Sequence, residues 1–424
     1  MAAIETTLSS SVAAAPAAPE VDRRALKAGL VRAQRLGRVR AFLLVAPLLA
    51  FVLLVFVGPV GLLLLRAVDN RAVSAALPQT ALAMAAWDGA GAPPDTAWAA
   101  MVADLRAAPS EVVADVAKRL NYYQPGFRSL LIKSGRAARN GKGADAKALL
   151  SDADAGWGDV QTWQTIRRAS ARFTDFYLLA AVDLHRAPDG TIVASADDSA
   201  IYREAIGRTF WITGVVTFAC LVLGFPVAWL LAHARPGVGN LLMGMVLLPF
   251  WTSLLVRTTA WVVLLQTNGV VNDLLRWLGV ISTPLELIHN RTGVIIAMTH
   301  ILLPFMVLPI YSVMRGIPPV FMKAAASLGA PPWRAFLRVY LPQTMPGIAA
   351  GTALVFILAL GYYITPSLVG GPRDQMLSYF VAYFANQANN WGMAAALSVV
   401  LLAIVLVLAG VFHRLVGFSR VKLG

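Results

Sequence analysis

Long uncharged apolar stretches recur along the 424-residue chain and dominate its pattern. A helix needs about 20 residues, at a rise of about 1.5 Å each, to cross the hydrocarbon core of a bilayer. Six stretches are long enough to do so, and the last two exceed a single span, so each must include some loop. They cover residues 41–65, 209–232, 237–256, 292–314, 341–372 and 375–412. This pattern predicts an all-α integral membrane protein with six transmembrane helices.

Composition and charge agree with this prediction. Hydrophobic residues make up 58% of the chain and charged residues only 14%, which is outside the range of soluble globular proteins. The net charge of +14 could suggest nucleic acid, but residues 69–204 hold 15 basic and 16 acidic residues, so the excess lies beside the apolar stretches. Basic residues near both termini, around Arg235 and around Arg334 alternate as expected for cytoplasmic segments. Nucleic acid is therefore not a predicted partner, and both termini are predicted to be cytoplasmic.

These patterns divide the chain into four parts. Residues 1–40 form a basic cytoplasmic segment, which anionic membrane lipid would attract. Residues 41–66 form the first transmembrane helix, which is longer than the roughly 7–15-residue apolar region of a cleaved signal peptide. Residues 67–205 form a periplasmic insertion. Residues 206–424 form a transmembrane core with a cytoplasmic loop at about 315–345.

The insertion is predicted to be mainly helical and soluble. The segments TAWAAMVADLRA and SEVVADVAKRL have apolar residues at helical spacing, and Ser110 is expected to cap the second helix. The segment DLHRAPDGTIVASA predicts a small β-hairpin. Two roles remain open for the insertion, which are a docking surface for a soluble partner and a passive structural addition.

The segment KAAASLGAPPWRAFLRVYLPQTMPGI, residues 323–348, separates two apolar stretches. The proline pair at 318–319 predicts a helix start, and Gly329 predicts its left-handed C-terminal cap. The proline pair at 331–332 predicts a second short helix through Tyr340. The alanines give the first helix a surface of low bulk that would fit a groove in a partner. Packing against the chain's own membrane helices is the alternative.

This segment resembles the cytoplasmic EAA loop in permease subunits of binding-protein-dependent ABC importers. That loop follows the pattern Glu-Ala-Ala, three residues, Gly, nine residues, Ile, any residue, Leu-Pro. The alanines, the glycine and the Leu-Pro pair match in register, whereas Lys323 stands at the glutamate position and Val339 at the isoleucine position. The resemblance implies a coupling helix seated in a cleft of a cytoplasmic ATPase. The implied ATPase-coupling residues are Lys323, Ala324, Ala325, Leu328, Gly329, Leu341 and Pro342.

The resemblance continues from about residue 209 to the C-terminus. The segments PFWTSLLVRTTAWVVLL, ILLPFMVLPIYSVM and PGIAAGTALVFILALGYYITPSLVGGPRD look like permeases of the spermidine/putrescine type. This implies a type I ABC importer permease core in a bacterial inner membrane, non-catalytic and without a cofactor. The implied partners are two cytoplasmic ATPase subunits, a second permease subunit and a periplasmic solute-binding protein. A polyamine is the favoured substrate; opines, phosphonates and ferric complexes remain open.

Two other classes fit the sequence less well. A membrane-anchored sensor, with residues 69–205 as its ligand domain, would need a large cytoplasmic output domain, and no predicted inner segment exceeds about 40 residues. An ion-coupled transporter would be expected to carry intramembrane carboxylates. The acidic residues after Glu204 are only Asp273, Glu286 and Asp374, all near predicted outer ends.

Polar and aromatic residues inside the apolar stretches are candidates for a translocation pathway. A charge within the membrane is costly unless it faces a cavity or a partner, and Arg257 is flanked by apolar runs on both sides. Tryptophan faces suit ammonium groups, and Pro366 is expected to open its helix locally. Interfacial anchoring, snorkelling and helix packing are the alternatives, and His300 is expected to hydrogen-bond between helices. The pathway candidates are Trp251, Arg257, Trp261, Tyr362, Tyr363 and Thr365.

Overall fold

The computed structural model describes residues 23–141, 145–187, 190–196 and 200–416. These residues are almost entirely helical, with one two-stranded sheet among them, so the predicted helical class is confirmed. The chain divides into two compact units between Leu62 and Leu63.

The first unit is built from one long helix, basic in its first part and apolar after Arg40. It comprises α1 (Arg23–Val52), the π-helical turn η1 (Leu53–Val57) and most of α2 (Gly58–Leu65). The wide turn ends just before Pro59, which has no amide hydrogen to continue regular helical bonding. The helix runs on without a break at residue 40, where the sequence suggested a boundary. The candidate span Arg40–Leu65 has 26 residues, which is long enough to cross a bilayer.

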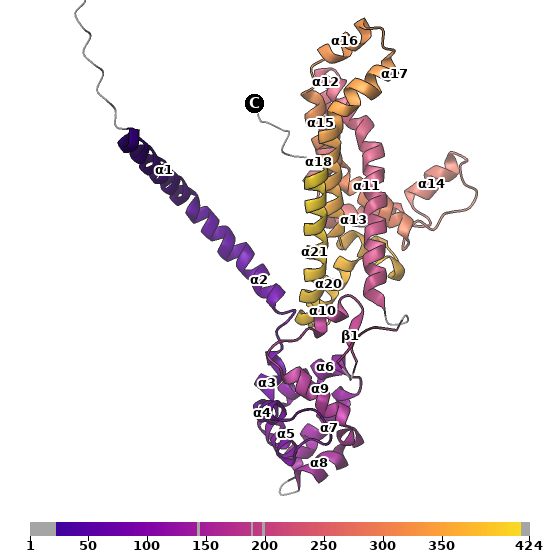
Figure 1. The fold of residues 1–424 in the computed structure, drawn as a ribbon. Helices are drawn as coiled ribbons and strands as arrows, with labels where there is room; N and C mark the ends of the chain where they lie inside the picture. The colour runs from indigo at the N-terminus through magenta and orange to yellow at the C-terminus, as the bar shows by residue number, and fades with distance from the viewer. Residues whose placement is uncertain (1–22, 142–144, 188–189, 197–199, 417–424) are drawn as a thin grey trace, which may run out of the picture. The chain divides into compact units, whose positions relative to one another are not determined.

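The insertion, residues 67–205, begins with a bundle of short helices (Figure 1). Its helices are α3 (Arg71–Ala76), α4 (Pro78–Ala86), α5 (Asp95–Ala107), α6 (Ser110–Tyr123), α7 (Phe127–Asn140), α8 (Ala146–Ala153), the 3-10 turn η2 (Ala155–Gly158), α9 (Val160–Ser170) and α10 (Phe176–Ala180). The two helices predicted from TAWAAMVADLRA and SEVVADVAKRL are confirmed as α5 and α6. The cap of α6 is Pro109, and Ser110 is already the first helical residue, so the predicted serine cap was wrong.

Three tryptophans form the centre of this bundle. The ring centres of Trp98 and Trp163 lie 4.8 Å apart, and those of Trp157 and Trp163 lie 5.0 Å apart. Trp157 is fully buried and donates its indole N–H to Ser134 Oγ at 2.7 Å. Asp145 caps α8 by accepting a backbone N–H with its side chain. The bundle therefore has the construction of a water-soluble domain, with large aromatic residues at its centre.

Backbone pairing holds the two ends of this bundle together. The Asn70 amide donates to the Arg172 carbonyl at 3.1 Å, and the Thr174 amide donates to the Val68 carbonyl at 2.9 Å. Beyond this closure lie α10 and the predicted hairpin, which is confirmed as the antiparallel strands β1 (Leu184–Arg186) and β2 (Ile192–Ala194).

The membrane core, residues 206–424, is helical throughout its described part. Its elements are α11 (Ile201–His233), α12 (Pro236–Leu247), η3 (Leu248–Trp251), α13 (Leu254–Leu264), α14 (Val270–Trp277), α15 (Arg291–Arg315), α16 (Val320–Ser327), α17 (Pro332–Ala335), η4 (Phe336–Tyr340), α18 (Leu341–Leu360), α19 (Ile364–Val369), η5 (Pro372–Asp374), α20 (Leu377–Asn386) and α21 (Trp391–Val416). Figure 1 shows α11, α15, α18 and α21 running along one another.

Helix α15 is the packing centre of the core and is approached closely by α11 and α18. Glycines allow this approach. A Cβ atom at Gly351 of α18 would lie 3.0 Å from the Met306 carbonyl, and one at Gly347 would lie 3.0 Å from the Pro309 carbonyl. Small residues at helix contacts are typical of membrane bundles, where van der Waals packing replaces the hydrophobic effect.

The described residues contain five helices long and apolar enough to cross a membrane, or six if one bent pair counts as a span. The bent pair corresponds to the predicted third span, residues 237–256. It is not a straight helix, because α12 with η3 and α13 meet at 100°. The bend follows Pro249, and the side chain of Ser253 caps α13 by accepting the Val256 amide at 3.2 Å.

The insertion packs against the core through α10 and α6. The Lys118 ammonium donates to the Ala388 carbonyl at 2.7 Å. Tyr177 of α10 is buried in a cluster with residues of α21, and a Cβ atom at Gly392 would overlap its ring. The Arg119 guanidinium lies 5.6 Å from the centre of the same ring.

Candidate coupling loop and translocation pathway

The 315–345 loop begins with a short helix and a glycine cap. The Gly329 amide donates to the Ala326 carbonyl at 2.9 Å, and the Ala330 amide donates to the Ala325 carbonyl at 3.1 Å. These two bonds form a Schellman motif, which requires a left-handed residue at the glycine. Gly329 has φ of +80°, so its predicted capping conformation is confirmed.

Most side chains of α16 and its C-terminal cap are exposed. Leu328 is 89% exposed, and Val320 and Phe321 are also exposed. Lys323 and Ala324 are exposed as well, and the Lys323 ammonium has no partner among the described residues, while Ala325 is half-buried. An exposed apolar surface of this kind is typical of a docking site.

The second half of the loop differs from the prediction. The segment from Pro332 does not end at Tyr340 but continues as one helix to Leu360. A π-helical turn, η4, joins the two parts, and Leu341 and Pro342 are the first two residues of α18. Since Pro342 has no amide hydrogen, the wider turn before it lets the helix proceed where regular bonding would fail.

The pathway candidates come from three elements of the core. The Thr258 hydroxyl of α13 and the Thr365 hydroxyl of α19 lie 3.2 Å apart and are both fully buried. The Trp261 indole donates to His300 Nδ1 at 3.1 Å, which confirms the predicted bond between helices through His300. Trp261 therefore has a partner on α15, and Thr365 has one on α13.

Among the candidates, Arg257 stands out because its side chain lacks a hydrogen-bond partner at one buried atom. Its Nε atom is buried and has no hydrogen-bond partner. The guanidinium lies close enough to His300 and Tyr362 to interact with both electrostatically. Tyr362 and Tyr363 follow the end of α18, and Pro366 lies in the first turn of α19, so the backbone is open here as expected. Trp251, in contrast, is 83% exposed at the bend and contributes to no such cluster.

Residues 209–418 match the family model of the binding-protein-dependent transport system inner membrane component. The spermidine/putrescine transport system permease protein PotB of Escherichia coli K12 is 36% identical over 214 residues, which are 50% of this chain and 78% of that protein. The chain belongs to this family.

Two further likenesses accompany that match. The inner membrane ABC transporter permease protein YdcU of Escherichia coli K12 is 34% identical over 232 residues, covering 51% of this chain and 72% of YdcU. A chain in the crystal structure of a bacterial alginate ABC transporter, in complex with an alginate pentasaccharide-bound periplasmic protein, aligns with a TM-score of 0.44 at 19% identity. That alignment covers 53% of this chain and 80% of the other.

Membership of this transport family makes the chain a multi-pass inner membrane permease component, a non-catalytic subunit for which no cofactor is expected. The family match begins at residue 209 and so leaves out the insertion and the first apolar helix.

One structural residue of the permease region was missed by the sequence reasoning. Asn272 is fully buried, and its amide donates to the Gln266 and Leu285 carbonyls at 3.1 and 2.9 Å. Its side-chain oxygen accepts the Leu285 amide at 2.9 Å, so a single side chain holds the 266–285 loop together. The available signal was a polar amide within the amphipathic helix GVVNDLLRWLG.

Proposed function

We propose that this chain is the membrane subunit of an ATP-driven importer that moves a polyamine, of the spermidine or putrescine kind, into the cytoplasm. The observation that carries this proposal is the 36% identity to PotB across 78% of that permease. Its partners would be two ATPase subunits, a second permease subunit and a periplasmic solute-binding protein. The insertion would face the periplasm.

The charges of the core are compatible with a cationic substrate in transit. Asp273 and Glu286 are exposed in the proposed outer loop and have no ion pair among the described residues, so they would attract an ammonium group. Arg257 lies within an apolar stretch of the core, further from the outer loop. Its positive charge would repel a cationic substrate and so prevent tight binding there. We infer that the binding protein selects the substrate. Arg257, Trp261 and the tyrosines at 362–363 would line a translocation route that binds the substrate only weakly.

The 315–345 loop would couple this route to the ATPase. Its exposed residues, Leu328 above all, would fill a groove in the ATPase subunit, while the Schellman cap fixes the direction in which α16 projects. Opening and closing of the ATPase pair would then bias the membrane helices between two states, since only differential contact energy can shift such an equilibrium. Lys323 would meet an acidic or neutral group on the partner.

Substrate identity is tested by uptake. Cells that produce the full set of subunits should accumulate radiolabelled spermidine or putrescine, and an excess of unlabelled polyamine should compete. An opine, a phosphonate and a ferric chelate serve as the alternative competitors. Competition by one of these, with none by polyamines, would overturn the polyamine assignment and leave the importer assignment intact.

Coupling is tested at Gly329. Gly329→Val should reduce uptake at least tenfold with unchanged membrane abundance, because a β-branched residue is strongly disfavoured at φ of +80°. Gly329→Asn should retain much of the uptake, since asparagine tolerates this conformation. Gly316→Ala, at a glycine with φ of −81°, is the matched control. Normal uptake by Gly329→Val would contradict the coupling role.

A further inference from the structure

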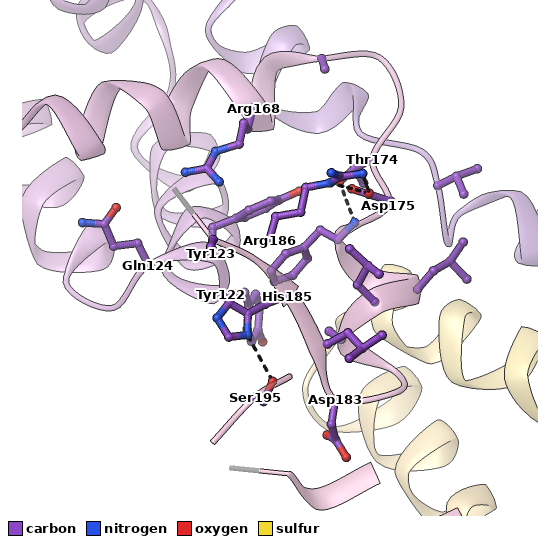
Figure 2. Close-up of a pocket in the computed structure, with 18 of the residues that line it drawn as sticks. Tyr122, Tyr123, Gln124, Arg168, Thr174, Asp175, Asp183, His185, Arg186 and Ser195 are labelled. Carbon is purple, nitrogen blue, oxygen red and sulfur yellow. Dashed lines mark hydrogen bonds and ion pairs between the residues drawn. The ribbon is translucent and has the colours of Figure 1, made fainter. Parts of the chain in front are cut away.

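A large cavity lies in the insertion, outside the proposed translocation route. Its volume is about 1170 Å³, somewhat above the usual range of about 300–1,000 Å³ for small-molecule sites. It is lined by residues of α6, α9, α10 and the hairpin, and by Tyr202 in the first turn of α11. Figure 2 shows the side chains that line it.

The carboxylates of the cavity are already neutralised. Asp175 accepts the Arg186 guanidinium at 2.6 Å. Asp183 is 2% exposed and accepts the Arg203 backbone amide at 2.6 Å, with the Arg203 guanidinium at 4.0 Å. A cationic ligand would therefore have to displace the Arg186 guanidinium from Asp175, while Asp183 is almost completely buried. The cavity is poorly suited to a polyamine.

Arg168 is the one formal charge among the described lining residues that has no counter-ion. Its Nε donates a long bond of 3.5 Å to the Gln164 carbonyl, and its two terminal nitrogens have no partner among the described residues. In Figure 2 the Arg168 guanidinium points away from the paired Arg186 and Asp175. The Gln124 side-chain oxygen lies 2.9 Å from the Thr165 hydroxyl oxygen, which also lies 2.9 Å from the Gln161 carbonyl, and the Gln124 NH₂ group has no partner among the described residues. A guanidinium and an amide that both donate favour an anionic head group.

Much of the rest of the wall is apolar, with aromatic side chains among aliphatic ones. Tyr123 and Phe176 stack with ring centres 4.0 Å apart. Phe173, at 65%, and Tyr122, at 39%, are more exposed than apolar and aromatic side chains usually are, so a ligand would cover surface that water now contacts. Arg172 lies 5.4 Å from the centre of the Phe173 ring and adds a second cation there.

The position of the cavity admits ligands from water or from lipid. Tyr202 precedes the uncharged stretch that begins at Thr209 by seven residues, or about 10 Å of helix. One lipid head-group layer is about 5–8 Å deep, so Tyr202 would lie just outside it.

We propose that this cavity binds an amphipathic organic anion, with a phosphate or carboxylate head at Arg168 and Gln124 and an apolar body against the aromatic wall. This site goes beyond the proposed import function, because its ligand has the opposite charge to a polyamine. The anion-binding proposal and the import proposal can therefore be disproved independently of each other.

The test uses the full chain in nanodiscs of zwitterionic phosphatidylcholine, titrated calorimetrically with octyl phosphate below its micellar concentration. Octyl phosphate should bind, while octyltrimethylammonium and spermidine should not. Arg168→Gln should weaken binding about tenfold or more, and Phe173→Ala should weaken it severalfold. Arg128→Gln, at an exposed arginine of α7 that does not line the cavity, should leave it unchanged.

Three results would overturn the proposal. They are no binding of octyl phosphate, equal binding by Arg168→Gln, and equal binding of the alkylammonium probe. Nanodiscs that contain anionic phosphatidylglycerol separate the two natural sources. Competition with octyl phosphate there would identify a lipid head group as the ligand, and unchanged binding would identify a soluble anion.

Discussion

The insertion and the membrane core use the same residue types in opposite ways. In the insertion, Trp157 and Trp163 are fully buried at the centre of a helical bundle. In the core, Trp251 and Trp277 are 83% and 80% exposed, while the closest helix contacts are made at glycines such as Gly347 and Gly351. These tryptophans therefore fill the interior of the insertion and lie on the surface of the core.

The difference reflects the solvent that each region is built for. In water, burial of large apolar side chains stabilises a fold by roughly 25 cal/mol per Å² of surface. Lipid offers no such gain, so close backbone approach and dispersion contacts are what hold helices together. A substitution should therefore be damaging for opposite reasons in the two regions, by removing volume from the insertion or by adding volume to the core.

The largest effect is expected for removal of volume from the insertion. Trp157→Ala should destabilise it by about 3–5 kcal/mol, the usual cost of truncating a buried aromatic residue. Urea titration of the full chain, followed by protease susceptibility of the insertion, measures this change. Trp277→Ala is the matched control and should have almost no effect. Equal destabilisation by the two variants would break the comparison.

Addition of volume to the core should have the next largest effect. Gly347→Leu would force α18 away from the Pro309 carbonyl and cost about 1–3 kcal/mol or more. Cys220 is the single cysteine of the chain and is fully buried in the core, so its rate of maleimide labelling on heating reports core opening. Gly347→Leu should speed labelling. Gly214→Leu, at a glycine with nothing within 4 Å, should leave the rate unchanged.

The smallest effect concerns the contact between the two regions. Burial raises the pKa of Tyr177 from its ordinary value of 10.0 to about 12. Because the folded pKa is raised, its contribution to stability is complete below pH 10 and is lost as pH rises toward 12. Relative to Tyr177→Phe, the wild type should lose about 1 kcal/mol at pH 11. Melting curves of both proteins at pH 8 and pH 11 measure this; a constant difference would exclude titration of Tyr177.

Features set by local sequence were predictable. The helices α5 and α6, the hairpin, and the left-handed cap at Gly329 all follow from residues within a few positions of one another. The 100° bend was missed because Pro249 and Ser253 lie inside an apolar run long enough to read as one span. Near Pro342 the opposite happened. The sequence predicted that a short helix ends at Tyr340, but a π-helical turn connects that helix directly to α18.

The sequence singled out Trp261, Thr365 and His300, but it did not indicate which residues they would contact. Trp261 and His300 are 39 positions apart, and Thr258 and Thr365 are 107 apart, so only the fold brings them together. The sequence also offered no sign that Arg257 Nε would be buried without a partner. Tertiary pairing of this kind depends on helix packing and has no local signature.

The continuity of the helix from Pro332 to Leu360 has a mechanical consequence. Its 29 residues make a rod about 43 Å long, with one end in the exposed loop and the other at the turn that carries Tyr362. A helix is stiff along its axis, and no hinge loop lies between the two ends. A displacement of the helix at Trp333 would therefore be carried to Gly361 through η4 and α18, and not through a loop.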